Sequence, residues 1–210
     1  MELVEADLLK PESFDAAVAG CTYVIHTASP FVIEPPKDEN VLIKPAVEGT
    51  LAVLRAAHKH RVKRVVITSS VVAIQYRTPE NAMAIYDETS WSDIEACDPY
   101  SKSKTLAEKA AWEFQMSLPV DERFELVVLN PGNIQGPSIV TNGDFSSGLM
   151  VNQFMSNFYP ALPKVQMGVV DVRECAHAHL QALKVPEAAN QRFILVSEVL
   201  WFTEMAAILA

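Results

Sequence analysis

The stretch TYVIHTA, residues 22–28, decides the fold class of this 210-residue chain. Its residues are mostly β-branched in a nearly continuous run, which is the pattern of a strand buried on both faces of a sheet. Apolar side chains then recur at helical spacing from Asn40 to His60, and RVVIT at residues 64–68 repeats the buried-strand pattern. A strand, a long helix and a second strand in this order predict a βαβ unit, and therefore a parallel sheet.

The alternation of helices and strands continues on both sides of this unit. Upstream, Pro11 opens a helical pattern that ends at Gly20, which is the usual placement of these two residue types around a helix. Downstream, the pattern predicts a mostly irregular segment over residues 71–99. The other predicted elements are helices over residues 100–116, 149–155 and 172–185, strands over 125–129 and 192–196, and a helical pattern that reaches residue 210.

The composition excludes several classes of protein. Hydrophobic residues make up 50% of the chain and charged residues 20%, which excludes a disordered or collagen-like polypeptide. No window approaches the ~20 apolar residues of a membrane span. A net charge of −9 argues against nucleic acid as a partner, and the basic run at residues 58–64 is expected to end a helix. Three separated cysteines and no basic, signal-like start lead us to expect a cytosolic protein without structural zinc or disulfides.

Polar residues at strand and helix ends provide a candidate active site. Ser69-Ser70 follow the strand at residues 64–68, at the carboxyl edge where parallel sheets bind ligands. Tyr100 and Lys104 share one helix face, and a neighbouring ammonium lowers the pKa of a phenol and makes it usable as an acid. Each feature also has an ordinary structural interpretation, as a turn or an exposed helix start. Their combination, followed by NPG at residues 130–132, is much rarer.

In these motifs the chain is similar to the extended short-chain dehydrogenase/reductases, and most of all to their dihydroflavonol-4-reductase-like branch. The matching segments are residues 6–8, 20–30, 64–70, 86–88, 91–93, 100–112, 131–137, 170–173 and 176–179. The resemblance implies an α/β fold: an incomplete, doubly wound parallel sheet of Rossmann type with part of a small substrate-binding lobe. The core would comprise residues 1–136 and 170–197, and the lobe residues 137–169 and 198–210.

The resemblance also implies an NADP(H)-dependent reductase that acts on a small ketone or aldehyde, or on the corresponding alcohol. Tyr100 would donate the proton, Lys104 would lower the Tyr100 pKa and bind the nicotinamide ribose, and Ser70 would hold the carbonyl oxygen. The residues expected to bind the cofactor are Asp7, Leu8, Thr27, Ala28, Ser29, Tyr100, Lys104, Pro131, Ile134 and Ser146. No metal is expected, because His26 fits a core histidine and His177 and His179 lie on different helix faces.

The sequence departs from the family at its beginning. The family opens with a strand and a Gly-x-x-Gly-x-x-Gly turn that binds the cofactor diphosphate, whereas the first glycine here is Gly20. Residues 2–4 resemble the third strand, so two strand–helix pairs and the end of the lobe are expected to be absent. The preference between NADPH and NADH therefore stays open. The alternatives are a non-catalytic remnant or interaction module and, among enzymes, a hydroxysteroid dehydrogenase or a sugar-nucleotide epimerase.

Overall fold

The computed structural model describes residues 2–30, 36–82, 85–139, 146–156 and 158–209. The chain divides into two compact units, of which the first comprises Met1–Asn130 and His179–Ile194. The second comprises Pro131–Ala178 and Leu195–Ala210. Within the described ranges, no helix is both long and apolar enough to cross a membrane.

The first unit is built on a four-stranded sheet in the order β1-β2-β3-β6. These strands are Tyr23–His26, Arg64–Thr68, Glu125–Pro131 and Gln191–Leu195. β1, β2 and β3 run parallel, and their first residues, Tyr23, Arg64 and Glu125, stand level with one another. The predicted parallel α/β architecture is therefore confirmed, and β2 begins and ends where its apolar pattern does.

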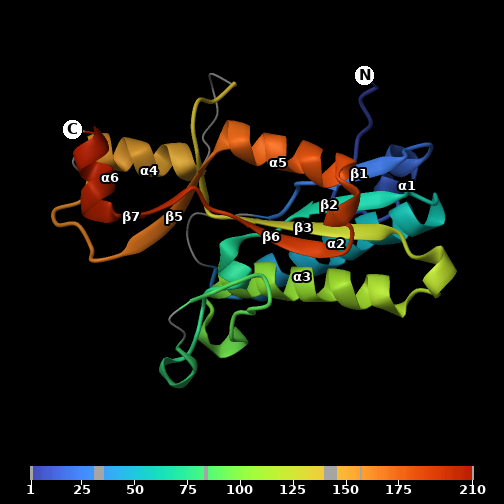
Figure 1. The fold of residues 1–210 in the computed structure, drawn as a ribbon, viewed down its shortest axis with the longest axis horizontal. Coiled ribbons are helices and arrows are strands. Elements are labelled where there is room, and N and C mark those ends of the chain that lie inside the picture. Colours follow the sequence, from blue (N-terminus) through green and yellow to red (C-terminus); the bar gives the residue numbers. More distant parts are fainter. Residues whose placement is uncertain (1, 31–35, 83–84, 140–145, 157, 210) are drawn as a thin grey trace. The chain divides into compact units, whose positions relative to one another are not determined.

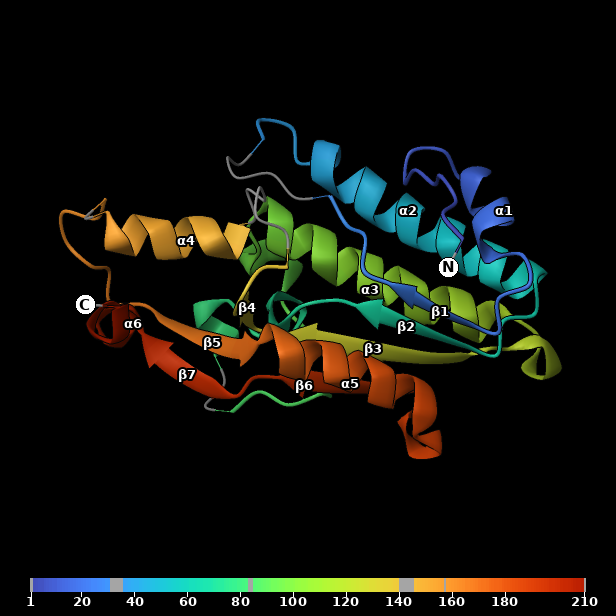
Figure 2. The same ribbon diagram turned by 90° about the horizontal axis from the view of Figure 1, so that it is seen from above.

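Helices cover the two faces of this sheet (Figures 1 and 2). α2 (Asn40–Lys59) and α3 (Pro99–Ser117) pack together on one face, where Val65 and Ile67 join the apolar core. The later turns of α5 (Val172–Lys184) lie on the other face, where Arg64 and Thr68 bond to them. The short helix α1 (Ser13–Val18) packs against α2, and Gly20 follows it with a φ of +76°. In the described part of the chain, 3-10 turns cover residues 71–73, 79–81, 94–96, 120–122 and 186–188.

The second unit holds a three-stranded sheet in the order β4-β5-β7. β4 (Asn133–Gln135) runs parallel to β5 (Gln166–Asp171), which pairs in the antiparallel sense with β7 (Glu198–Trp201). The helices are α4 (Ser146–Met155) and α6 (Phe202–Leu209). The sequence pattern predicts both helices but misses all three strands. Each strand is short, and Gly168 interrupts the apolar run of β5.

Two sequence-based expectations about strands are wrong. Residues 2–4 form no strand, and Leu3 is 86% exposed, because no described strand pairs with this segment. β1 is not buried on both faces: Tyr23 is 47% and Ile25 39% exposed. The reason is that β1 forms an edge of the described sheet, whereas β2, with the same kind of sequence, lies between two strands.

Candidate active site

A small hollow lies at the carboxyl ends of β1 and β2, inside the first unit. β1 and the loop after it, β2 with Ser69, α2 and α3 all contribute side chains to it. The lining residues are His26, Ala28, Ser29, Thr50, Ile67, Thr68, Ser69, Lys104, Ala107 and Glu108. The structure thus brings together Ala28, Ser29 and Lys104, which the sequence predicted for one site, at the sheet edge where the predicted topology places it.

The start of α3 fixes the predicted tyrosine and lysine. Asp98 caps this helix, since its Oδ1 accepts hydrogen bonds from the N–H groups of Tyr100 and Ser101 at 2.9 and 3.0 Å. Tyr100 therefore lies in the first turn, and Lys104 follows one turn later on the same face. The Lys104 Nζ atom lies 5.9 Å from the centre of the Tyr100 ring.

Burial dominates the ionisation of this pair. Lys104 is 8% exposed, and burial lowers its pKa to about 8, while the carboxylate of Glu108 acts in the opposite direction. Burial, together with the charge of Asp98, raises the pKa of Tyr100. This direction is opposite to the lowering that the resemblance implies, because burial and the Asp98 charge both disfavour the phenolate. Tyr100 is consequently protonated at neutral pH, as a proton donor has to be.

Ser70 follows β2 and begins the next turn. Its Oγ accepts a hydrogen bond from the N–H of Val72 at 3.4 Å and so caps the 3-10 turn at residues 71–73. α3 packs against this same turn, so Ser70 and the helix that carries Tyr100 belong to adjoining parts of the first unit. The backbone oxygen of Ser70 also accepts a bond from Asn130 Nδ2 at 3.1 Å.

Apart from Tyr100 and Lys104 on α3, the residues predicted to bind the cofactor fall into three places. Thr27, Ala28 and Ser29 follow β1, and the first two are exposed. Asp7 and Leu8 lie before α1: Asp7 Oδ1 accepts a bond from the N–H of Leu9 at 2.9 Å, and Leu8 packs on Gly49 of α2. The other three belong to the second unit or to its boundary. Pro131 ends β3, Ile134 lies in β4 opposite Val170, and Ser146 begins α4 with a side chain outside the described residues.

The histidines and cysteines of the first unit have structural surroundings. His26 is buried beside Thr50, with 3.4 Å between Nε2 and Oγ1, and burial lowers its pKa to about 4, so it is neutral. His179 Nε2 lies 2.7 Å from Thr68 Oγ1. Burial raises the pKa of the Cys97 thiol, which keeps it protonated. Among the described residues, no three His, Cys, Asp or Glu side chains form a group that could hold a metal.

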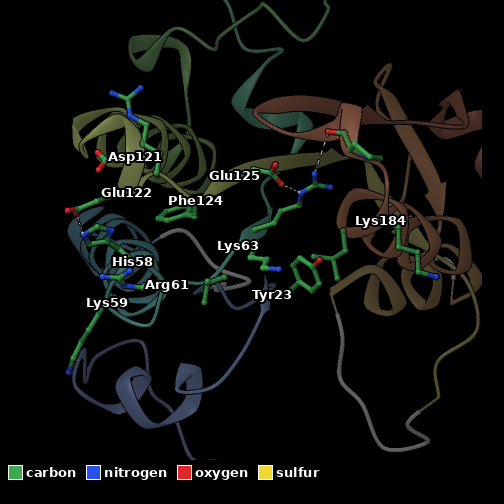
Figure 3. Close-up of a pocket in the computed structure, with 15 residues that line it drawn as sticks. Tyr23, His58, Lys59, Arg61, Lys63, Asp121, Glu122, Phe124, Glu125 and Lys184 are labelled. Carbon is green, nitrogen blue, oxygen red and sulfur yellow. Dashed lines mark hydrogen bonds and ion pairs between the residues drawn. The ribbon is translucent and has the colours of Figure 1, made fainter.

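A larger hollow of about 900 Å³ lies at the opposite edge of the sheet, where Tyr23, Arg64 and Glu125 begin their strands (Figure 3). Several of its polar side chains contact one another or a neighbouring residue. Arg64 Nε donates to Glu125 at 2.7 Å, and His58 Nε2 lies 3.4 Å from Glu122. Because parallel sheets bind ligands at the carboxyl edge instead, the site containing Lys104 remains the candidate.

Sequence reasoning missed three residues beside this site, namely Glu108, Asn130 as a side-chain donor, and Arg192. Glu108 is buried and contacts both of the others. Its place four residues after Lys104 was the available signal, since both then lie on one helix face. Arg192 gave no signal, because its contact with Glu108 spans 84 residues of sequence.

The parallel sheet, the helices on its two faces and the polar residues at its carboxyl edge define a Rossmann-type α/β protein. The family model described as the NAD dependent epimerase/dehydratase family matches residues 1–196. The chain belongs to this family, within which it resembles the extended short-chain dehydrogenase/reductases.

Two curated plant proteins are similar over the whole chain. Cinnamoyl-CoA reductase CAD2 of Medicago truncatula is 36% identical over 218 aligned residues, which cover 100% of this chain and 64% of the relative. An anthocyanidin reductase of Vitis vinifera is 32% identical, with 100% and 65% covered. The chain therefore spans slightly less than two thirds of the length of these relatives.

One solved structure is similar in both fold and sequence. It is the yeast methylglyoxal/isovaleraldehyde reductase Gre2 in complex with NADPH, with a TM-score of 0.84 and 34% identity. The match covers 97% of this chain and 65% of the yeast chain.

Proposed function

We propose that this chain carries the catalytic residues of an NADP(H)-dependent carbonyl reductase of the dihydroflavonol-reductase-like type. The observation that carries the proposal is the placement of Tyr100 and Lys104 one turn apart on α3, with that helix packed on the turn that Ser70 caps. The similar proteins support it, since they are named as reductases and one was crystallised with NADPH.

In this proposal Tyr100 and Ser70 act on the oxygen of a ketone or aldehyde. Their hydroxyl groups donate hydrogen bonds to the carbonyl oxygen, which gains negative charge as the carbonyl carbon is reduced. Tyr100 then transfers its proton to that oxygen and completes the alcohol. NADPH, when bound, supplies the hydride. The raised pKa of Tyr100 keeps the proton in place until the oxygen develops charge.

Lys104 fits the ribose of the nicotinamide. Within the part of the chain that the structure describes, its buried ammonium donates no hydrogen bond, so its N–H groups are available to hydroxyl oxygens. Thr27, Ala28 and Ser29 offer an accessible strand end beside it. We assign Asp7 and Leu8 to the adenine end, and Pro131, Ile134 and Ser146 to the nicotinamide and diphosphate.

The 3-10 turns at residues 71–73, 79–81 and 94–96 of the first unit are proposed to contribute to the substrate pocket for a small carbonyl compound. The expected compartment remains the cytosol, on the grounds of composition and the three separated cysteines.

Titration of the purified protein with NADPH tests this proposal. We expect enhanced nicotinamide fluorescence, consumption of NADPH when aldehydes or ketones are added, and about 2.7 kcal/mol of added stability at 100 times the Kd. NADH titrated in parallel measures the coenzyme preference. No binding at millimolar NADPH would contradict the proposal and would favour a non-catalytic role for the chain.

A further inference from the structure

Glu108 forms the centre of a buried polar cluster in the first unit. Its side chain is fully buried, and three groups from different elements donate to its carboxylate. Arg192 Nε of β6 lies 2.5 Å from Oε1, while Ser69 Oγ at 2.5 Å and Asn130 Nδ2 at 2.8 Å share Oε2. Ser69, Glu108, Asn130 and Arg192 together form the Glu108 cluster.

The Glu108 cluster contacts the backbone of the proposed catalytic serine. Ser69 directly precedes Ser70, and Asn130 Nδ2 donates to the Ser70 backbone oxygen at 3.1 Å as well as to Glu108. The Glu108 carboxylate on α3 thus bonds directly to Ser69 at the end of β2. Asn130 of β3 links the same carboxylate to the backbone of Ser70. An active-site group must be held to a fraction of an ångström for full activity, so these bonds bear on where Ser70 Oγ lies.

Glu108 also acts on Lys104 by its charge. The two residues are one helical turn apart, and the carboxylate opposes the effect of burial on the lysine pKa. Among the described residues, the titratable groups that act on or contact Lys104 are Glu108 and Tyr100 on the same helix and His26 on β1. His26 is neutral at pH 7, whereas the negative charge of Glu108 stabilises this ammonium.

Arg192 connects the cluster to the segment before α3. Its Nη1 donates to the backbone oxygens of Glu88 and Ser90 at 2.7 and 2.8 Å. Its guanidinium carbon lies 3.8 Å from the centre of the Trp91 ring. The same cation therefore forms an ion pair with Glu108 and anchors residues 88–91, which lie between the 79–81 and 94–96 turns of the proposed substrate pocket.

Stability alone is a weak reason for such an arrangement. The desolvation of two buried charges offsets most of their attraction, and an apolar pair of similar size is often as stable. The cluster is nevertheless hydrogen-bonded on both carboxylate oxygens and adjoins two of the three proposed catalytic residues. We infer that Glu108, with Arg192 as its counter-ion, is a positioning residue that fixes Ser70 and sets the charge around Lys104. This inference rests on the proposed reductase function.

Three variants distinguish the effect of the Glu108 charge from the effect of its side-chain length. Glu108→Gln removes the charge, Glu108→Asp keeps it on a shorter side chain, and Glu113→Gln removes an exposed carboxylate from the same helix as a matched control. We expect Glu108→Gln to lower kcat by about 10- to 100-fold at neutral pH, with NADPH affinity within about twofold. Its alkaline loss of activity should begin at lower pH, because Lys104 loses its proton more easily. Glu108→Asp should lower kcat but keep the pH profile, and Glu113→Gln should match the wild type.

Wild type and Tyr100→Phe measured in parallel keep the two proposals apart. If the wild type turns over and Tyr100→Phe does not, but Glu108→Gln retains both kcat and pH profile, the positioning role is wrong and the reductase function stands. Absence of wild-type turnover overturns both. If the Glu108 variants do not fold, Ser69→Ala, which removes one donor and no charge, decides. A lowered kcat with unchanged NADPH affinity supports the role, and an unchanged kcat overturns it.

Discussion

Lys104 combines a positive charge with a side chain that is only 8% exposed. Its pKa is about 8 here and 10.5 in an ordinary setting, so between these pH values the unfolded chain binds more protons than the folded one. The free energy of unfolding contributed by this group therefore rises with pH across that window. Below pH 8 the buried charge costs on the order of 3 kcal/mol. A buried charge with this energetic cost is typical of a functional site.

Replacement by an uncharged side chain of similar length tests this cost. We predict that Lys104→Met raises the free energy of unfolding at neutral pH by ~1–3 kcal/mol, while carbonyl reduction is lost. Urea unfolding at neutral pH and well above pH 8 measures the gain, which should shrink as the wild-type lysine loses its proton. Lys102→Met, at a half-buried lysine that bonds to Glu39 at the N-cap of α2, is the control and should bring no gain. A Lys104→Met protein less stable than the wild type at neutral pH would refute the account.

His26 shows the same effect at acid pH. Its pKa is about 4 in the folded chain and 6.5 in an ordinary setting, so stability is lost as pH falls from 6.5 towards 4. The loss attributable to this group is on the order of 3 kcal/mol. We predict that His26→Gln loses less stability than the wild type between these two pH values, measured by urea unfolding at pH 6.5 and pH 4. Equal losses in the two proteins would contradict the assignment.

At the scale of elements, sequence patterns predicted the long helices, in which apolar side chains recur at helical spacing over many residues. α2 and α3 contain 20 and 19 residues, and their periodic apolar positions, with Asp98 as a cap, define them closely. β4, β5 and β7 contain 3, 6 and 4 residues, too few for a period to emerge. The exposure of β1 could not be predicted either, since burial depends on which strands lie beside it and not on its own residues.

Gly132, which lies between β3 and β4, packs closely against the backbone of Gly168 in β5. A Cβ at Gly132 would overlap the backbone oxygen of Gly168, which cannot move away as a flexible side chain could. We predict that Gly132→Ala destabilises the second unit by about 1–3 kcal/mol, as overpacking does. Gly148→Ala, within helix α4, is the matched change and should leave stability equal or slightly higher. Thermal unfolding of both variants measures the difference, and a Gly132→Ala protein as stable as Gly148→Ala would disprove the close approach.

At the scale of the whole molecule, the order of motifs along the chain carried more information than any single motif. A serine after β2, a tyrosine and lysine on the next helix, and NPG at the end of β3 indicated the family before any geometry was known. The same order could not reveal the Glu108 cluster, because Arg192 meets Glu108 only once β6 has taken its place beside β3. Contacts of this kind arise from topology, and a local pattern does not encode them.

The central claim is that Tyr100 is the proton donor of a carbonyl reductase. Turnover of an aldehyde with NADPH by the Tyr100→Phe protein tests it most directly. Tyr23→Phe, at an exposed tyrosine that begins β1, provides the same change away from the site. The account predicts that kcat falls by about 10²- to 10⁴-fold in Tyr100→Phe, with the Kd for NADPH nearly unchanged, and stays at the wild-type value in Tyr23→Phe. A Tyr100→Phe protein that retains wild-type turnover would contradict it.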